Sequence, residues 1–461
     1  MIERNYNSNL PIIQQFSAAL VIGLGNTGYS VVRYLSQRGL KIKVIDSRIE
    51  PPMLNQLKEQ YPEVECVFGS FDSAPEEKNL LVVLSPGIAL HEPYIRKLKK
   101  LGAHIVGDVE LFIEENTKPL IAITGSNGKS TVTTLVGEMC LAAGCVPLVA
   151  GNIGLPVLDA LTDNINYDVG VLELSSFQLE TTSSIQADSA TILNVSADHM
   201  DRYESMGDYT LAKARVLRGA KCVVLPRHDE LLQQITHNST HFLSFDLDEP
   251  ANDNEYGVSR IANSRWLVKG SQKILRLAEV RLTGLHNIKN VLAAFALLEF
   301  LNLPLEKLID AVKAFLGLPH RMQTVLAHQG VTWVNDSKAT NVGATKTALL
   351  SLEKDIVWIA GGQGKGADFN ELKDAIGKKI QVLVLMGEDA DAMESALKDC
   401  LPILRVADMH SAVKKALEQV KEQSIVLLSP ACASFDMYDN FEQRGDDFAS
   451  QVRTLTGEGE A

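Results

Sequence analysis

Residues 124–131, with the sequence TGSNGKST, combine residue types and spacing suited to binding a triphosphate. They follow an apolar stretch at 120–123 and precede a helical pattern at 132–143. In a strand, glycine loop and helix of this kind, backbone N–H groups and the helix N-terminus face the phosphates. Lys129 would reach the phosphates, and the hydroxyl of Ser130 could bind Mg²⁺. The segment predicts ATP use, with a chance glycine-lysine turn as the alternative.

A second glycine pattern, Gly23-x-Gly25-x-x-Gly28, follows the apolar stretch at 18–22, and Asp46 ends the next apolar stretch. A tight turn of this kind can present amides to a pyrophosphate, and the carboxylate can accept from a ribose or a uracil ring. The alternative is a plain turn that packs a helix on a strand. Nicotinamide binding would be the usual interpretation, but no hydride-transfer site is found elsewhere in the sequence.

Three further residues could serve a nucleotide site. Glu173 ends the apolar stretch at 169–172, where a phosphate-loop enzyme places a carboxylate for Mg²⁺. His199 also follows an apolar stretch, and Lys213 lies in a helical pattern. Each has a structural alternative: an exposed strand end, a buried histidine with no ligand role, and a solvated lysine. The residues alone do not select Lys213.

The last third of the chain contains three polar loops rich in cations or glycine. Arg321 lies near a proposed hinge, residues 336–341 follow one apolar stretch, and the glycine-lysine run 361–366 follows another. Arginine can contact a phosphate or carboxylate through two N–H groups, and lysine supplies a mobile charge. Although each could be a surface loop, together they indicate anion binding.

Apolar stretches alternate with helical patterns along nearly the whole chain, which predicts an α/β protein with mostly parallel sheets flanked by helices. We expect three domains: a Rossmann-like domain at 1–108, a P-loop ATPase-like domain at 109–317 and a second Rossmann-like domain at 318–461. The polar interval 246–273 indicates short strands and turns, and a helix is expected at 290–301. The main expected strands are 18–22, 41–45, 80–84, 120–123, 169–172, 190–195, 331–334, 356–360, 382–386 and 425–428.

The chain has 461 residues and a net charge of −13, which disfavours a broad nucleic-acid surface because such a surface must be basic. Its six cysteines show no CxxC pair, so reduced thiols are favoured over disulfides or structural zinc. Residues 1–16 lack the pattern of a signal peptide, and no apolar run is long enough to span a membrane. A cytoplasmic monomer without membrane or nucleic-acid partners is expected.

Taken together, these segments resemble the Mur ligases, ATP-dependent enzymes that build the peptide of the peptidoglycan precursor. The short gap between Gly125 and Gly128 is that family's own form of the phosphate loop. The resemblance covers nearly the whole chain and rests on residues 23–28, 85–88, 124–131, 151–154, 173–180, 198–202, 284–290, 319–321, 335–340 and 429–434.

The resemblance implies a chemistry in which ATP phosphorylates the carboxylate of a bound UDP-sugar-alanine to give an acyl phosphate. An amino-acid amine then attacks, and phosphate leaves from a tetrahedral intermediate. The branch that best fits the last segment, 434–441, uses UDP-N-acetylmuramoyl-L-alanine and D-glutamate. Catalysis would come mostly from positioning and charge neutralisation.

The resemblance also assigns roles to residues. Lys129, Glu173, His199 and Lys213 match the catalytic centre. Two Mg²⁺ sites are implied, from Ser130, Glu173, His199 and Lys213, with Lys213 carbamylated by CO₂ into an oxygen ligand. ATP-binding positions are Gly125, Asn127, Gly128, Lys129, Ser130, Thr131, Asn287, Asn290, Arg321, Asp336 and Lys338. UDP-substrate positions are Gly25, Asn26, Thr27, Asp46, Ser47, Arg48, Gly87, Asn152 and His199. The D-glutamate positions are Lys338, Thr340, Lys365, Ser434 and Phe441.

Other functions remain open at this stage. Another Mur-type ligase would add a different amino acid, but the Asp-Asn-Pro-Arg sequence of the diamino-acid-adding relatives is missing. A folate-type polyglutamate ligase would share the phosphate loop without needing a glycine-rich UDP domain in front. A dehydrogenase with an attached ATPase domain lacks a hydride-transfer partner. A noncatalytic nucleotide-binding regulator would differ in metal binding and phosphate release.

Overall fold

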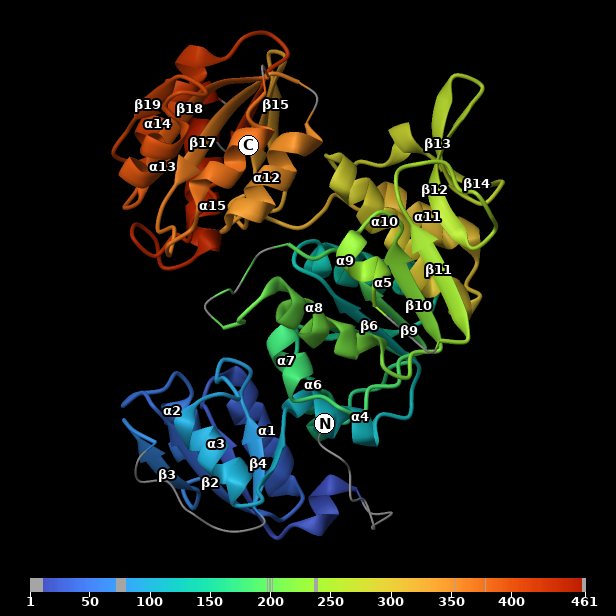
Figure 1. Cartoon of the computed structure of the whole chain (residues 1–461), viewed down its shortest axis with the longest axis vertical. Helices are drawn as coiled ribbons and strands as arrows, with labels where there is room; N and C mark the ends of the chain where they lie inside the picture. The colour runs from blue at the N-terminus through green and yellow to red at the C-terminus, as the bar shows by residue number, and fades with distance from the viewer. Residues whose placement is uncertain are drawn as a thin grey trace.

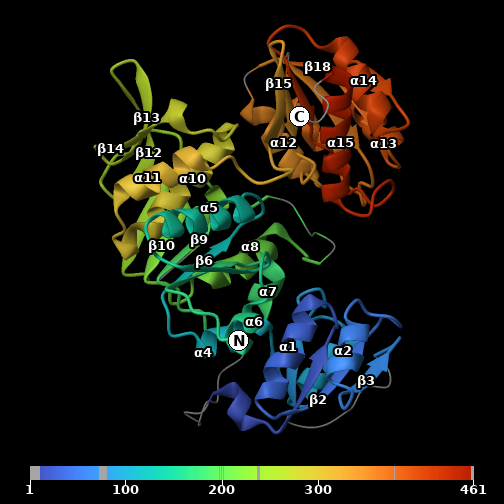
Figure 2. The same ribbon diagram turned by 180° about the vertical axis from the view of Figure 1, so that it is seen from behind.

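The chain forms three α/β domains, each built on its own sheet, in a computed structural model that describes residues 11–71, 80–196, 198, 200, 202–235, 239–352, 354–377 and 379–457. Figure 1 shows the N-terminal and C-terminal domains at opposite ends of the central domain, and Figure 2 shows the same arrangement from behind. The predicted fold class is confirmed. Within the described residues, we find no helix that combines the length and the apolarity needed to cross a membrane.

The N-terminal domain has a five-stranded sheet in the order β3-β2-β1-β4-β5, in which each neighbouring pair is parallel. Its strands are β1 (Ala18–Ile22), β2 (Lys41–Asp46), β3 (Glu65–Phe68), β4 (Leu81–Leu84) and β5 (His104–Val106). The short 3₁₀ helix is η1 (Ile12–Gln15), and the α-helices are α1 (Asn26–Gln37), α2 (Leu54–Gln60), α3 (Pro93–Lys100) and α4 (Asp108–Glu115).

The central domain has a nine-stranded sheet in the order β14-β13-β12-β11-β10-β9-β6-β8-β7. The pairs from β7 to β12 are parallel, and β12, β13 and β14 form an antiparallel meander at one edge. The strands are β6 (Leu120–Thr124), β7 (Pro147–Gly151), β8 (Val169–Glu173), β9 (Ser189–Ile192), β10 (Cys222–Pro226), β11 (His241–Phe245), β12 (Glu255–Ile261), β13 (Ser264–Lys269) and β14 (Gln272–Arg276). The helices are α5 (Lys129–Ala142), α6 (Val157–Thr162), α7 (Ser176–Glu180), α8 (Met206–Ala214), η2 (Arg215–Leu217), α9 (Glu230–Gln233), η3 (Leu277–Glu279), α10 (Leu285–Leu298), η4 (Glu299–Leu301) and α11 (Leu305–Ala314).

The C-terminal domain has a six-stranded sheet in the order β15-β16-β20-β17-β18-β19, with β15 antiparallel to β16 at one edge and the other pairs parallel. The strands are β15 (Gln323–His328), β16 (Val331–Asn335), β17 (Ile356–Gly361), β18 (Ile380–Met386), β19 (Ile403–Arg405) and β20 (Ile425–Leu428). The helices are α12 (Val342–Ser351), η5 (Phe369–Ala375), α13 (Ala390–Leu397), α14 (Met409–Gln419) and α15 (Phe441–Thr456).

The apolar cores of the three domains are unequally connected. One buried cluster runs from Ile12 through Phe112 to Leu232, and so joins the N-terminal domain to one face of the central sheet. The two buried clusters of the C-terminal domain contain described residues from 322 to 452 and no buried residue of the other two domains. Since shared buried surface resists separation, the first two domains form one packed unit and the third is attached more loosely.

Polar contacts between domains follow the same division. Arg33 on α1 pairs with Asp159 and Asp163 on and beside α6, at 2.7 and 2.6 Å. Nη1 of Arg202 donates to the carbonyl oxygen of Pro86 at 2.9 Å, which fixes the loop after β4 to the central domain. These contacts hold the N-terminal domain against the phosphate-loop domain.

Most expected strands are confirmed, while several boundaries are wrong. The helix expected at 132–143 begins at Lys129, because Gly128 has a left-handed φ of 85° at the N-cap and the polar first turn hides the apolar period. The helix expected at 290–301 begins at Leu285, so it already includes Asn287 and Asn290. The strand expected at 190–195 ends at Ile192. The meander expected in 246–273 extends to Arg276.

Candidate active site

The phosphate loop joins β6 to α5 at the carboxyl edge of the central sheet, with β6 lying between β9 and β8. Glycine is required at position 128 for two reasons. Its φ of 85° lies in the left-handed region, and a Cβ there would stand 2.6 Å from Oδ1 of Asn290. The loop backbone therefore approaches α10 directly. This close approach brings Asn290, which the resemblance implied for ATP, against the loop.

Two lysines share one backbone acceptor in this loop. Nζ of Lys129 donates to the carbonyl oxygens of Gly125 and Ser126 at 2.8 and 2.9 Å, and Nζ of Lys213 donates to the same Gly125 oxygen at 2.9 Å. The Lys213 side chain on α8 is almost fully buried and stacks over the Tyr209 ring, 4.3 Å from its centre. Burial lowers the pKa of both lysines, and the charge of Lys129 lowers that of Lys213 further. Lys213 is therefore suited to being a neutral amine.

Glu173 lies at the end of β8, beside the loop, with 1% of its surface exposed. Its Oε1 accepts from Nδ2 of Asn152 at 2.8 Å, whereas its buried Oε2 has no hydrogen-bond partner among the described residues. A buried oxygen without a partner is costly unless a ligand satisfies it. Mg²⁺ prefers oxygen ligands, so Glu173 together with the Ser130 hydroxyl fits a magnesium site.

The C-terminal domain contacts the phosphate loop through Arg321. Nη2 of Arg321 donates to Oγ of Ser130 at 2.8 Å. A second contact joins the same two domains where Nδ2 of Asn341 donates to Oδ2 of Asp198 at 3.2 Å. Asn341 also caps α12, because its Oδ1 accepts from the Ala344 N–H at 2.8 Å. Both contacts lie at the carboxyl edge of the central sheet.

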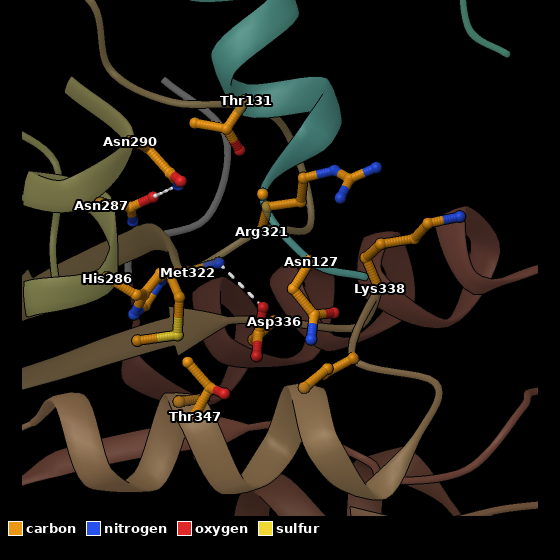
Figure 3. Close-up of a pocket in the computed structure, with 14 residues that line it drawn as sticks. Asn127, Thr131, His286, Asn287, Asn290, Arg321, Met322, Asp336, Lys338 and Thr347 are labelled. Atoms are coloured by element: carbon orange, nitrogen blue, oxygen red, sulfur yellow. Dashed lines mark hydrogen bonds between the residues drawn. The ribbon is translucent and has the colours of Figure 1, made fainter. Parts of the chain in front are cut away.

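A narrow cavity of about 80 Å³ lies between these two domains. Figure 3 shows residues that line it. A wider cavity of about 580 Å³ adjoins it and shares Asn127, Gly128, His286, Asn290 and Thr347 with it. In the figure, Asn290 donates to Asn287 at 3.0 Å, and both extend from α10 toward the cavity. The polar and cationic side chains that line the two cavities, together with the phosphate loop, could contact a nucleotide.

Asp336 enters the narrow cavity from the C-terminal domain, directly after β16. Its Oδ1 accepts from the Met322 N–H at 3.1 Å, and its Oδ2 accepts from the Ser429 hydroxyl at 2.9 Å. Burial raises the pKa of Asp336 to about 7. The carboxylate is thus held at a fixed place where it can accept a further hydroxyl group, and its charge depends on pH near neutrality.

The glycine turn of the N-terminal domain forms a second site, at the carboxyl edge of its sheet. A Cβ at Gly28 would stand 1.9 Å from the Gly23 carbonyl oxygen, so α1 packs tightly on the turn. Asp46 accepts from the Leu24 N–H at 2.7 Å and from the Arg48 side chain. Burial opposes the charge of Asp46, but these hydrogen bonds outweigh it and lower the pKa. At this edge, Asn26, Ser47 and Gly87 are exposed, and Gly25 and Thr27 are half-buried.

The residues implied for an amino acid lie together in the C-terminal domain. Nζ of Lys338 lies 3.9 Å from the centre of the Phe441 ring, and burial lowers the pKa of Lys338. Ser434 is buried in the loop after β20. Lys365 follows β17, and its Nζ is 5.1 Å from the Phe435 ring. The N–H of Thr340 donates to the Lys338 carbonyl at 2.7 Å.

The structure places the predicted residues at the carboxyl edges of three sheets, one in each domain, with one exception and some additions. His199 lies outside the described residues, so its side chain has no described position. Residues that were not predicted from the sequence are His286, Met322 and Thr347, which line the narrow cavity, and Asn341 and Arg202 at the domain contacts. His286 stands directly before the predicted Asn287, and Arg202 lies within the quoted segment 198–202. For these two residues, their position beside a recognised motif was the signal in the sequence that could have identified them.

The fold and the phosphate loop define a three-domain P-loop nucleotide-binding protein. The chain matches the Mur ligase MurD-like N-terminal domain over residues 17–107, the Mur ligase middle domain over 123–298 and the Mur ligase glutamate ligase domain over 320–432. It belongs to the Mur ligase family, which confirms the resemblance.

Similar proteins agree over nearly the whole chain. UDP-N-acetylmuramoylalanine--D-glutamate ligase of Pseudomonas aeruginosa is 46% identical over 95% of this chain and 98% of its own length. The protein of the same name from Legionella pneumophila is 45% identical over 95% and 99%. Among solved structures, MurF ligase from Thermotoga maritima in complex with ADP has a TM-score of 0.59 at 14% identity, covering 97% of this chain and 98% of its own. MurC from the same organism has a TM-score of 0.58 at 18% identity, covering 95% and 99%. These structures share the fold.

Proposed function

We propose that this protein forms an amide bond between UDP-N-acetylmuramoyl-L-alanine and D-glutamate, using ATP, in peptidoglycan precursor synthesis. The observation that carries the proposal is the 46% identity to a ligase of that name over 95% of the chain. The geometry supports it, because a phosphate loop, a glycine turn for a nucleotide-linked donor and a cationic cluster for an acceptor all occur in one chain. Another Mur-type amino-acid ligase is the alternative.

The reaction begins with the donor, for which we propose Gly25, Asn26, Thr27, Asp46, Ser47, Arg48, Gly87, Asn152 and His199 as contacts. The donor carboxylate attacks the γ-phosphorus of ATP, so a carboxyl C–O–P bond forms and the bond to ADP breaks. The carbonyl carbon of the resulting acyl phosphate is electrophilic, whereas that of the free carboxylate is not. The neutral amine of D-glutamate then attacks the acyl carbon, and a C–N bond forms. The nitrogen releases one proton to the solvent, and inorganic phosphate leaves with the C–O electron pair.

The chain's own residues neutralise and position these anions. Lys129 would exchange its two carbonyl acceptors for the phosphate oxygens of ATP, and Arg321 would turn from Ser130 to the transferred phosphate. Asp336 would accept from a ribose hydroxyl, and Asn287 and Asn290 would contact the nucleotide. The other proposed ATP contacts are Gly125, Asn127, Gly128, Ser130, Thr131 and Lys338.

Ser130 and Glu173 would hold one Mg²⁺, with His199 and a carbamylated Lys213 at a second site. The ions would neutralise charge between the two reacting anions. For Glu173, the support is its orphaned buried oxygen, and for Lys213, the burial that favours a neutral amine able to add CO₂. The proposal that His199 belongs to the second Mg²⁺ site rests on the family resemblance.

For D-glutamate we propose Lys338, Thr340, Lys365, Ser434 and Phe441, because two carboxylates need cations and hydroxyl groups. We also propose domain boundaries near residues 108 and 317, between the sheets, and a monomer that acts in the cytoplasm, where ATP and UDP-linked precursors are available.

A phosphate-release assay tests the function. We expect release only when ATP, Mg²⁺, UDP-N-acetylmuramoyl-L-alanine and D-glutamate are all present. L-Glutamate and D-alanine serve as matched controls for configuration and side chain. Release with D-alanine but not with D-glutamate would instead favour a different Mur-type ligase, and release without any acceptor would contradict the ligase proposal.

A further inference from the structure

Arg444 is a buried arginine on the second turn of α15, with 1% of its surface exposed. Its guanidinium makes five hydrogen bonds to two loops. Nε donates to Oγ of Ser337 at 3.0 Å, and Nη2 donates to the Ser337 carbonyl at 2.8 Å and the Cys432 carbonyl at 3.1 Å. Nη1 donates to the carbonyls of Cys432 and Ala433 at 3.1 and 3.2 Å.

The five hydrogen bonds go to four acceptors, all of them carbonyl or hydroxyl oxygens rather than carboxylates. Burying a guanidinium costs free energy, and burial lowers the pKa of Arg444 to about 10. A planar group with N–H donors in a fixed fork sets the positions of its acceptors more strictly than a lysine could. The arrangement therefore fixes the loop containing Ser337 relative to the loop containing Cys432 and Ala433.

A third loop meets the same guanidinium. A Cβ at Gly362 would stand 3.2 Å from Nη1 of Arg444 and 2.3 Å from the Ala433 carbonyl oxygen. Gln363 and Ala433 also exchange two backbone hydrogen bonds, at 3.0 and 2.9 Å. The glycine-rich loop after β17 is thus held at Arg444 through Ala433.

These segments are the ones that hold the proposed acceptor contacts. Lys338 follows Ser337, Ser434 follows Ala433, and Lys365 lies in the loop of Gly362. The hydroxyl of Ser337 also donates to the carbonyl of Phe441, on the same helix as Arg444, at 2.8 Å. Four of the five proposed D-glutamate contacts therefore depend on segments that converge on one guanidinium.

From this convergence, and given the proposed D-glutamate site, we infer that Arg444 is a positioning residue for the amino-acid acceptor. It sets the spacing between the cations and the hydroxyl that bind the two carboxylates of the acceptor. It touches neither substrate nor nucleotide. Its removal should then impair acceptor binding more than nucleotide binding. Asp336 and Lys338 flank Ser337, but Asp336 is also held by Met322 and Ser429. Within the described part of the chain, no hydrogen bond joins the Arg444 side chain to the phosphate loop, Asn290 or Arg321.

The test measures steady-state kinetics of Arg444→Lys and Arg444→Ala in the full-length protein. We expect KM for D-glutamate to rise about tenfold or more, because small displacements of binding groups are costly. KM for ATP should stay within about threefold, since Asp336 keeps its hydrogen bonds to Met322 and Ser429 and most proposed nucleotide contacts lie in the central domain. Arg453→Ala is the matched control: it removes an exposed arginine from the last turn of the same helix and should change neither constant.

Ser337→Ala provides a second variant if the Arg444 variants fail to fold. It deletes the acceptor of Nε and the contact with Phe441 while leaving the charge in place. It should raise KM for D-glutamate in the same direction by a smaller factor. Equal increases in KM for D-glutamate and ATP, or unchanged constants in the folded variants, would overturn the inference. Wild-type protein without D-glutamate-dependent turnover would instead overturn the proposed function.

Discussion

The guanidinium of Arg321 donates to the hydroxyl of Ser130 at 2.8 Å, although the two residues are 191 positions apart and belong to different domains. Ser130 is the hydroxyl proposed for Mg²⁺, and Arg321 is the cation proposed for the transferred phosphate. In this structure, Arg321 therefore binds the hydroxyl that is proposed to bind Mg²⁺, and Ser130 binds the guanidinium that is proposed to bind phosphate. With these proposed roles, we expect nucleotide and metal binding to separate this pair before the reaction begins.

Replacing Arg321 should remove a charge that acts on the transferred phosphate. We expect Arg321→Ala to lower kcat by about 10²- to 10³-fold, the range seen when one such donor is deleted. Phosphate release at saturating substrates measures the effect, with Arg453→Ala as the control. A kcat within twofold of wild type, allowing roughly for assay error, would remove Arg321 from the reaction.

Lys213→Ala should abolish turnover, because it removes the amine proposed to become an oxygen ligand through addition of CO₂. Short-chain carboxylic acids, or bicarbonate, should restore part of the activity by supplying an oxygen anion in the vacated space. Lys221→Ala is the control, since Lys221 is an exposed lysine of the same domain that pairs with Asp188. Full activity of the Lys213 variant in the absence of added acid would contradict the carbamate proposal.

The phosphate loop and Glu173 could be predicted from the sequence because each directly follows a recognisable apolar strand. Residues 124–131 form a loop whose spacing has one main structural solution, and Glu173 follows a recognisable apolar strand. Parallel strands bring their carboxyl ends to one edge, so the strand-end residues meet without further information.

The remaining parts depend on tertiary contacts that leave no local pattern. Arg444 lies in a polar helix, and its five hydrogen bonds join it to residues 11 to 107 positions away. Asn341 is recognisable as a helix cap, but its second contact, with Asp198, joins residues 143 positions apart. The start of α10 was predicted five residues too late, because the polar residues His286 and Asn287 in its first turn interrupt the apolar periodicity.

Nucleotide affinity should depend on the protonation of Asp336, whose pKa burial raises to about 7. The ionised form is the better acceptor for a ribose hydroxyl, so wild-type affinity for ADP should increase as pH rises through about 7. Calorimetric titration of wild type and Asp336→Asn at each pH measures the effect. Their difference cancels the ionisation of ADP itself, and a difference that does not vary with pH would contradict the role.

The raised pKa of Asp336 also makes the stability of the folded protein depend on pH, in the direction opposite to that of ADP affinity. Because the pKa of Asp336 in the folded protein lies above the ordinary aspartate value of 3.8, the folded state binds this proton more tightly than the unfolded state. The contribution of Asp336 to stability is therefore largest below pH 3.8 and is lost as pH rises toward about 7. Asp336→Asn should flatten this part of the dependence, as measured by thermal unfolding across the pH range.

The shared core of the first two domains and the separate cores of the third predict which domain moves. We expect the C-terminal domain to close as a rigid body when Mg-nucleotide and the UDP-substrate bind, while the N-terminal domain keeps its place. Spectroscopic labels at Lys58 on α2, Leu141 on α5 and Lys415 on α14, in a Cys400→Ser background that removes an exposed thiol, separate the two motions. The distance from Leu141 to Lys415 should change, and that from Leu141 to Lys58 should not. Unchanged small-angle scattering together with two constant distances would contradict closure. A change in the Leu141–Lys58 distance alone would show that the N-terminal domain moves instead.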